Sequence, residues 1–232
     1  MYFSTYKTKK MSKRKIENKG VTKKCRFTSI CIFGETDSGK DGEFIPAAQE
    51  LGRALAARKI NFVYGRGLGG LKLSMAIPAT INGSKGLYVR VKELENHIFS
   101  LGQELEVSSL PERMRRMFYR ADAFIALPGG FETLDAISSI AYWAKLNFHK
   151  KPLGLLNVNG FYDNLLSFLD HAVETGFIPQ ATRHSIISAP TADQLLDKLQ
   201  TYEPQPDLLV KEKGGQSSGS SQKQNPDTTL RL

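Results

Sequence analysis

Short apolar runs alternate with segments of helical periodicity along most of the chain. The apolar runs are rich in branched and aromatic residues and end at glycine, proline or polar positions, which is typical of buried strands. In the other segments apolar residues recur every three or four positions, as Ala47, Leu51 and Leu55 do. The pattern predicts strands at residues 27–33, 60–64, 86–91, 104–108, 123–127, 153–157 and 185–188, and helices at residues 44–58, 71–81, 111–120, 131–143, 162–175 and 192–202.

This alternation predicts a single α/β domain in which helices cover both faces of a parallel sheet. Ligands bind such sheets outside the carboxyl ends of the strands. Two glycine-rich loops, at residues 65–70 and 128–130, follow predicted strands directly. Glycine lets the backbone approach a ligand closely, and the N–H groups that open the next helix attract anions. We therefore expect residues 128–130, the glycine turn, to hold a phosphate group.

The basic excess of the chain lies outside this domain. The formal net charge is +9, but residues 1–26 hold ten Lys and Arg and one acidic residue, so the remainder is neutral. A nucleic-acid-binding domain would carry a basic face on the fold itself, so no nucleic-acid partner is expected. Residues 1–26 are predicted to be a disordered basic tail, and residues 27–202 the folded domain. Residues 203–232, rich in Pro, Gly, Ser and Gln, are predicted to form a disordered tail at the other end.

Location and metal binding follow from simpler features. No apolar run approaches the ~20 residues of a membrane span, so no membrane association is expected. Two cysteines without a secretory signal favour a reducing compartment, the cytoplasm, and the basic run at residues 9–15 also fits a nuclear localisation signal. The histidines at positions 149, 171 and 184 lack paired ligand spacing, so no metal site is expected.

Residues 27–202 resemble the lonely-guy family, plant and microbial cytokinin riboside 5′-monophosphate phosphoribohydrolases that are often mislabelled lysine decarboxylases. The resemblance is carried by residues 143–162 and continues through residues 176–178, 183–184 and 188–191. It implies a Rossmann-like fold, a homodimer and no cofactor. It also implies hydrolysis of the bond between an N6-modified adenine and ribose 5-phosphate, which activates the cytokinin.

The family signature P-G-G-x-G-T-x-x-E is only partly kept. Residues 128–130 and Thr133 match it, but Glu132 replaces the third glycine and Ala136 replaces the catalytic glutamate. On the preceding helix Arg113 matches the family arginine, whereas Met114 replaces its lysine. The second loop keeps three glycines of the family pattern, and Gly34-Glu35 stands where a cysteine-glycine pair normally follows the first strand.

The resemblance assigns roles to the matching positions. It implies that Arg113 is catalytic and stabilises charge on the substrate. Gly129, Gly130 and Thr133 would hold phosphate, and Phe131 and Leu134 at the helix start would also contact the substrate. The second loop (Gly65, Gly67, Gly70) would form the opposite wall, and Tyr142 would lie at the ligand's edge.

The departures predict weak activity. Cleavage of an N-glycosidic bond needs a carboxylate near the ribose or an acid near the base, and Ala136 supplies neither. Asp135 lies about 100° around the helix and is expected to point elsewhere. Glu132 shares a face with Ala136 but leans away from it, and it puts an anion where phosphate should dock. Arg66 or Lys72 could neutralise that charge or bind phosphate, and Arg116, on the helix face of Arg113, could replace the lost lysine charge.

Other functions stay open. The chain could be a catalytically dead paralogue that binds a nucleotide or forms heterodimers with active family members, or an enzyme for an altered substrate. Residues 65–70 also satisfy the G-x-G-x-x-G dinucleotide fingerprint. An NADP-dependent oxidoreductase is a remote alternative, since the loop follows the second strand and no acidic residue ends the next one.

Overall fold

The computed structural model describes residues 26–65, 69–94 and 100–205. These residues build a seven-stranded parallel sheet in the order β4-β3-β2-β1-β5-β6-β7. The strands are β1 (Ser29–Phe33), β2 (Asn61–Gly65), β3 (Gly86–Val91), β4 (Gln103–Val107), β5 (Ala123–Ala126), β6 (Leu153–Leu156) and β7 (Ile186–Ala189). The helices are α1 (Phe44–Ala57), α2 (Gly70–Ile81), α3 (Leu110–Tyr119), α4 (Phe131–Lys145), α5 (Asp163–Glu174), α6 (Gln180–His184) and α7 (Ala192–Thr201), with a 3₁₀ turn, η1, at Val158–Gly160.

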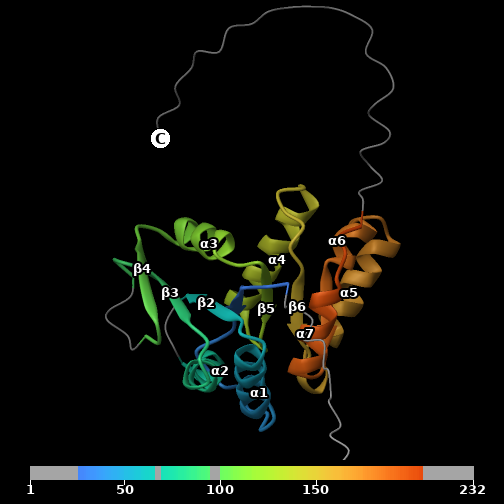
Figure 1. Ribbon diagram of the computed structural model, residues 1–232. Coiled ribbons are helices and arrows are strands. Elements are labelled where there is room, and N and C mark those ends of the chain that lie inside the picture. The colour runs from blue at the N-terminus through green and yellow to red at the C-terminus, as the bar shows by residue number, and fades with distance from the viewer. Residues whose placement is uncertain (1–25, 66–68, 95–99, 206–232) are drawn as a thin grey trace, which may run out of the picture.

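Helices cover both faces of this sheet (Figure 1). The apolar stripes of α1, α2 and α7 bury residues such as Leu51, Met75 and Leu196 against one face. On the other face α3, α4 and the start of α5 pack residues such as Phe118 and Ile140. The fold class predicted from the alternating pattern, a doubly covered parallel sheet, is confirmed.

The strand order changes direction between β1 and β5. From β1 the chain adds β2, β3 and β4 on one side, and it then returns to add β5, β6 and β7 on the other. Ile30 of β1 therefore pairs with Phe62 of β2 on one side and with Ala123 of β5 on the other. Crevices at such switch points, outside the carboxyl ends of the strands, are where doubly wound sheets bind ligands. The glycine turn lies there, directly after β5.

The predicted strands and long helices are found close to their expected bounds. The exceptions are α6 and η1, which are too short for apolar periodicity to indicate them. The N–H of Arg26 donates to the side-chain oxygen of Gln200 at 2.9 Å, so the described part of the chain starts against α7. The rest of the predicted tails lies outside the described residues, and their disorder stays a prediction. No described helix is both long and apolar enough to cross a membrane.

Candidate functional site

A small cleft lies at the switch point. Its volume is about 40 Å³, and it is bounded by the ends of β1 and β2, the start of α2, one side of α3 and the first turns of α4. The lining residues are Ile32, Phe33, Gly34, Gly65, Lys72, Arg113, Met114, Met117, Glu132, Asp135 and Ala136. The fold thus brings together Gly65, the family arginine and the three altered signature positions, which are far apart in the sequence.

Arg113 and Glu132 form an ion pair across the cleft. The Nη2 atom of Arg113 lies 3.5 Å from Oε1 of Glu132, and the two side chains are only 13% and 24% exposed. Gly65 allows this placement of the arginine, because a Cβ atom there would lie 3.2 Å from Cδ of Arg113 and 2.8 Å from Sδ of Met117. Beside the pair Ala136 is 1% exposed, so the position of the family's catalytic carboxylate holds only a buried methyl group.

The cations suggested to compensate for the altered positions have different surroundings. Arg116 pairs with Glu112 at 3.3 Å on the exposed side of α3. Lys72 is 2% exposed, lies in the cleft and donates from Nζ to the carbonyl oxygen of Gly65 at 3.2 Å. Arg66 lies outside the described residues, as does Gly67. Arg113, the cation that the resemblance implies would stabilise charge on the substrate, is therefore paired with Glu132.

Glu35 is the residue of this site whose position the sequence did not reveal. Its Oε1 accepts the backbone N–H of Gly130 at 3.0 Å, so a carboxylate lies at the N-terminus of α4. Negative charge is favoured there because unpaired N–H groups and the helix dipole meet at that end. The one available signal was the altered pair after β1, where Glu35 follows Gly34.

The glycine turn is tightly packed beneath that carboxylate. A Cβ atom on Gly129 would lie 2.2 Å from Oγ1 of Thr133 and 3.2 Å from Cγ of Glu35, so glycine is required there. The Thr133 hydroxyl is fully buried and has no hydrogen-bond partner among the described residues. Tyr162 holds the preceding strand end, donating its hydroxyl to the carbonyl oxygen of Leu127 at 2.5 Å. Burial, and then the negative charge of Glu35, raise the pKa of Tyr162.

Other predicted binding residues lie away from the cleft. Phe131 is 91% exposed, and Leu134 and Tyr142 also lie on the exposed side of α4. Gly70 opens α2 at a φ of 45°, and a Cβ atom there would lie 2.4 Å from the carbonyl group of Asp37. It therefore supports the loop after β1. Asp135, expected to point elsewhere, lines the cleft because the site extends sideways along α4.

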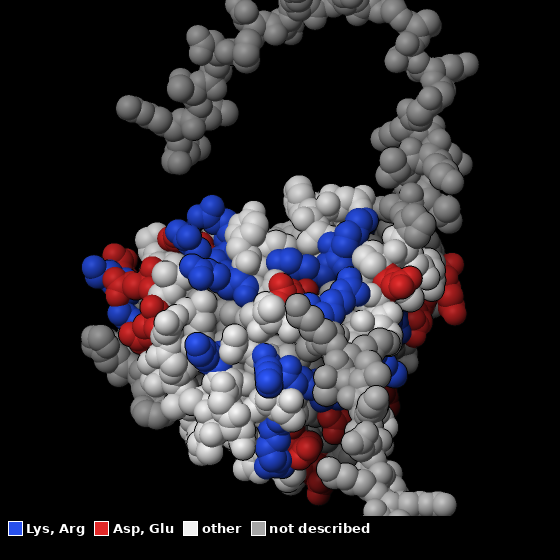
Figure 2. All heavy atoms as spheres, viewed as in Figure 1, with Lys and Arg blue, Asp and Glu red and all other residues white. Residues whose placement is uncertain are grey.

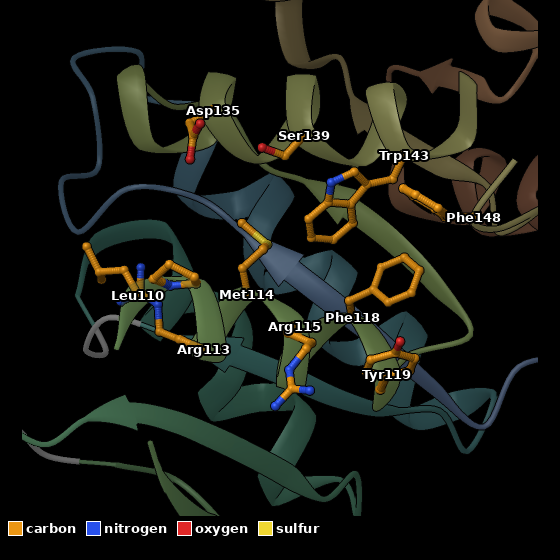
Figure 3. A pocket seen from close by; sticks show the side chains of 11 residues that line it. Leu110, Arg113, Met114, Arg115, Phe118, Tyr119, Asp135, Ser139, Trp143 and Phe148 are labelled. Carbon is orange, nitrogen blue, oxygen red and sulfur yellow. The ribbon is translucent and has the colours of Figure 1, made fainter. Parts of the chain in front are cut away.

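That extension is an apolar groove between α3 and α4, with a volume of about 730 Å³ (Figure 3). Its lining residues are Leu110, Pro111, Arg113, Met114, Arg115, Phe118, Tyr119, Asp135, Ser139, Trp143 and Phe148. Arg113, Met114 and Asp135 line both the groove and the cleft, so the two are continuous. In Figure 3 the rings of Phe118, Tyr119, Trp143 and Phe148 gather at one end, and Asp135 and Ser139 project from α4.

Charged side chains are unevenly spread over the face that carries α3. Lys and Arg gather over and beside α3, whereas acidic side chains collect at the β4 edge (Figure 2). Among the described residues no group of three His, Cys, Asp or Glu side chains is arranged to hold a metal ion.

Comparison with known proteins settles the family. A family model described as "Possible lysine decarboxylase" matches residues 65–199. A rice protein named probable cytokinin riboside 5′-monophosphate phosphoribohydrolase LOGL9 is 43% identical over 192 residues, covering 77% of this chain and 80% of the relative. The chain belongs to the lonely-guy family. The Arabidopsis thaliana member named cytokinin riboside 5′-monophosphate phosphoribohydrolase LOG7 is 41% identical over 190 residues, covering 81% of this chain and 88% of its own.

Solved structures agree with the fold of this lonely-guy protein. A molybdenum cofactor binding protein from Rippkaea orientalis aligns with a TM-score of 0.57 at 16% identity, covering 76% of this chain and 97% of that one. The Moco carrier protein of Chlamydomonas reinhardtii aligns with a TM-score of 0.52 at 20% identity, and the alignment covers 75% of this chain and 100% of that one. Similarity at this level of identity shows the shared architecture alone.

Proposed function

We propose that this lonely-guy protein hydrolyses the N-glycosidic bond of a cytokinin riboside 5′-monophosphate and releases the free base and ribose 5-phosphate. The substrate class is the one for which its relatives, 41–43% identical, are named. The observation that supports it best is the cleft itself, where Arg113 lies at the switch point against the first turn of α4. We propose further that turnover is slow, because Ala136 removes the family's carboxylate.

The chemistry left to the cleft follows from its charges. Breaking the bond develops positive charge on the ribose and negative charge on the leaving base. Glu132 and Asp135 are the carboxylates that line the cleft, and Glu132 is held by Arg113. A carboxylate at either of these positions stabilises the ribose less well than one at position 136, since a misplacement of about 1 Å can cost about 100-fold in rate. The cleft thus retains charge for binding but little for bond cleavage.

Replacing Arg113 by Gln should lower the rate of base release from isopentenyladenosine monophosphate by about 10- to 100-fold. The change removes the cation from the cleft and leaves Glu132 without the ion pair that the structure shows. Chromatographic measurement of free base, with purified full-length protein, reports the rate. Arg120→Gln is the matched control, because Arg120 is exposed at the end of α3 and lines neither the cleft nor the groove.

Nucleotide binding without turnover is the second candidate function. It is favoured by the methyl group at position 136, which leaves this position of the cleft without the family's catalytic carboxylate. The same assay separates the two functions. If the unaltered protein binds the monophosphate but releases base no faster than a reaction without protein, hydrolysis is excluded and the binding role stands.

We also propose that the chain forms a homodimer through the α3–α4 groove. Tyr119 and Phe148 are each 71% exposed at its rim, and Leu110 is 48% exposed. Monomeric proteins seldom leave a contiguous apolar surface of this kind uncovered. A second copy of the chain covers it best, given the homodimer implied by the family resemblance. Light scattering on the purified protein should give twice the 25.8 kDa mass of the chain; a monomer would contradict the proposal and favour a heterodimer with a paralogue.

The cytoplasm is the location we propose, with nuclear entry as the alternative. Cys31 is a free thiol buried in β1, and burial raises its pKa, so it stays protonated and unreactive. A chain whose described cysteine is free and buried suits a reducing compartment. The basic run at residues 9–15 lies outside the described residues.

A further inference from the structure

The anion-binding end of α4 is already occupied by a side chain of the protein. Glu35 accepts the N–H of Gly130 at 3.0 Å, and its Cγ packs against the position that a Cβ on Gly129 would take. A 5′-phosphate bound at the glycine turn would need the same N–H group and the same space. Phosphate binding at this turn therefore requires Glu35 to move away first.

The charges around the turn oppose phosphate as well. Glu132 lies in the first turn of α4, and Asp135 lines the cleft one turn further along. Of the cations that line the cleft, Arg113 is engaged by Glu132, and Lys72 donates to the carbonyl oxygen of Gly65. A carboxylate about 4 Å from a phosphate charge repels it strongly enough to lower affinity by up to about 1000-fold at an effective dielectric constant near 20.

The turn nevertheless keeps the groups that an anion would use. The hydroxyl of Thr133 is buried without a partner in the described structure and lies directly beneath Gly129. The Gly130 N–H points at Glu35 and would be released if that side chain were shortened. The frame for phosphate is therefore present, and Glu35 is the group that blocks it.

We infer that Glu35 acts as an internal substitute for the 5′-phosphate, so that this site accepts the phosphate-free riboside as readily as the monophosphate. This inference rests on the proposed function, because it takes an N6-modified adenine riboside as the ligand. It makes Glu35 a specificity-determining residue in a chain whose family relatives are named for the monophosphate.

Titration calorimetry with isopentenyladenosine and its 5′-monophosphate tests this inference on the full-length protein. The unaltered protein should bind the two ligands with dissociation constants within about threefold of each other. Glu35→Ser, which vacates the helix end, should tighten monophosphate binding by about 10- to 100-fold and leave riboside binding within about threefold. Glu35→Gln, which removes the charge but keeps the shape, should give an intermediate gain.

Glu174→Gln is the matched control, since Glu174 is an exposed carboxylate on α5, far along the chain from the turn. Circular dichroism of each variant checks that the fold is intact. The inference is overturned if the unaltered protein already prefers the monophosphate more than about tenfold, or if both Glu35 variants leave the ratio of dissociation constants unchanged. In either case the proposed function survives. If no variant binds either ligand, the proposed function fails and this inference falls with it.

Discussion

The double variant Glu132→Gly with Ala136→Glu should release free base from isopentenyladenosine monophosphate about 100- to 1000-fold faster than the unaltered protein. The new carboxylate would lie in the cleft at the position of the family's catalytic glutamate. Removal of the Glu132 side chain also takes away the carboxylate that pairs with Arg113 at 3.5 Å in the unaltered protein. The gain comes from both changes, because a positioned carboxylate and a cation no longer paired with Glu132 stabilise opposite charges in the same transition state.

Space in the cleft makes the two substitutions depend on each other. The cleft holds only about 40 Å³, and Ala136 is 1% exposed within it. Ala136→Glu alone would bury a second carboxylate beside Glu132, and like charges that share a site disfavour ionisation of one of them. The single variant should therefore gain much less than the double variant. We therefore expect the effects of the two substitutions on the rate not to be additive, as is usual for residues in contact.

A control separates position from charge in this experiment. Ser138→Glu combined with Glu132→Gly adds a carboxylate to the same helix at an exposed position and should not raise base release beyond the effect of Glu132→Gly. Chromatography of the free base measures all variants, and the thermal transition of each confirms folding. An unaltered protein that already matches the double variant would show that another group performs the cleavage.

The framework of this site could be predicted from the sequence, because its signals are local. The apolar runs gave the strands, and the glycine turn between a strand and a helix marked the switch point. Arg113 was singled out because it matches the family pattern, and Glu132 and Ala136 because they depart from it. The fold places all three in one cleft.

The interactions that distinguish this chain could not be predicted in the same way. The hydrogen bond from Gly130 to Glu35 joins residues 95 positions apart, and it exists only because β1 and β5 are adjacent in the sheet. The pairing of Arg113 with Glu132 likewise needs the distance between α3 and α4. The helical wheel predicted that Asp135 points away from the site. Asp135 nevertheless lines the cleft, because the cleft continues into the groove along that side of α4. Sequence patterns specify the face of one element, not the neighbour that it meets.

Gly52→Ala should lower the free energy of unfolding by about 2 to 3 kcal/mol, although helix propensity alone favours alanine by about 1 kcal/mol. Gly52 lies inside α1, on the side that packs against α2. A Cβ atom there would lie 2.1 Å from the carbonyl oxygen of Met75 and 2.9 Å from Cγ of Pro78. Both neighbours are held by the helix, so the two helices must move apart at a buried contact. Overpacking is therefore expected to exceed the gain in propensity.

Urea unfolding followed by circular dichroism measures this difference, with Gly42→Ala as the matched control. A Cβ atom on Gly42 would meet no atom within 4 Å, so that variant should leave stability within about 0.5 kcal/mol. A Gly52→Ala protein that is more stable than the original would show that α1 and α2 separate at little cost. Such freedom would matter for the site, because α2 supplies Lys72 to the cleft and its first residue, Gly70, packs against the loop after β1. Gly52 thus sets how closely α1 packs against α2, the helix that carries Lys72.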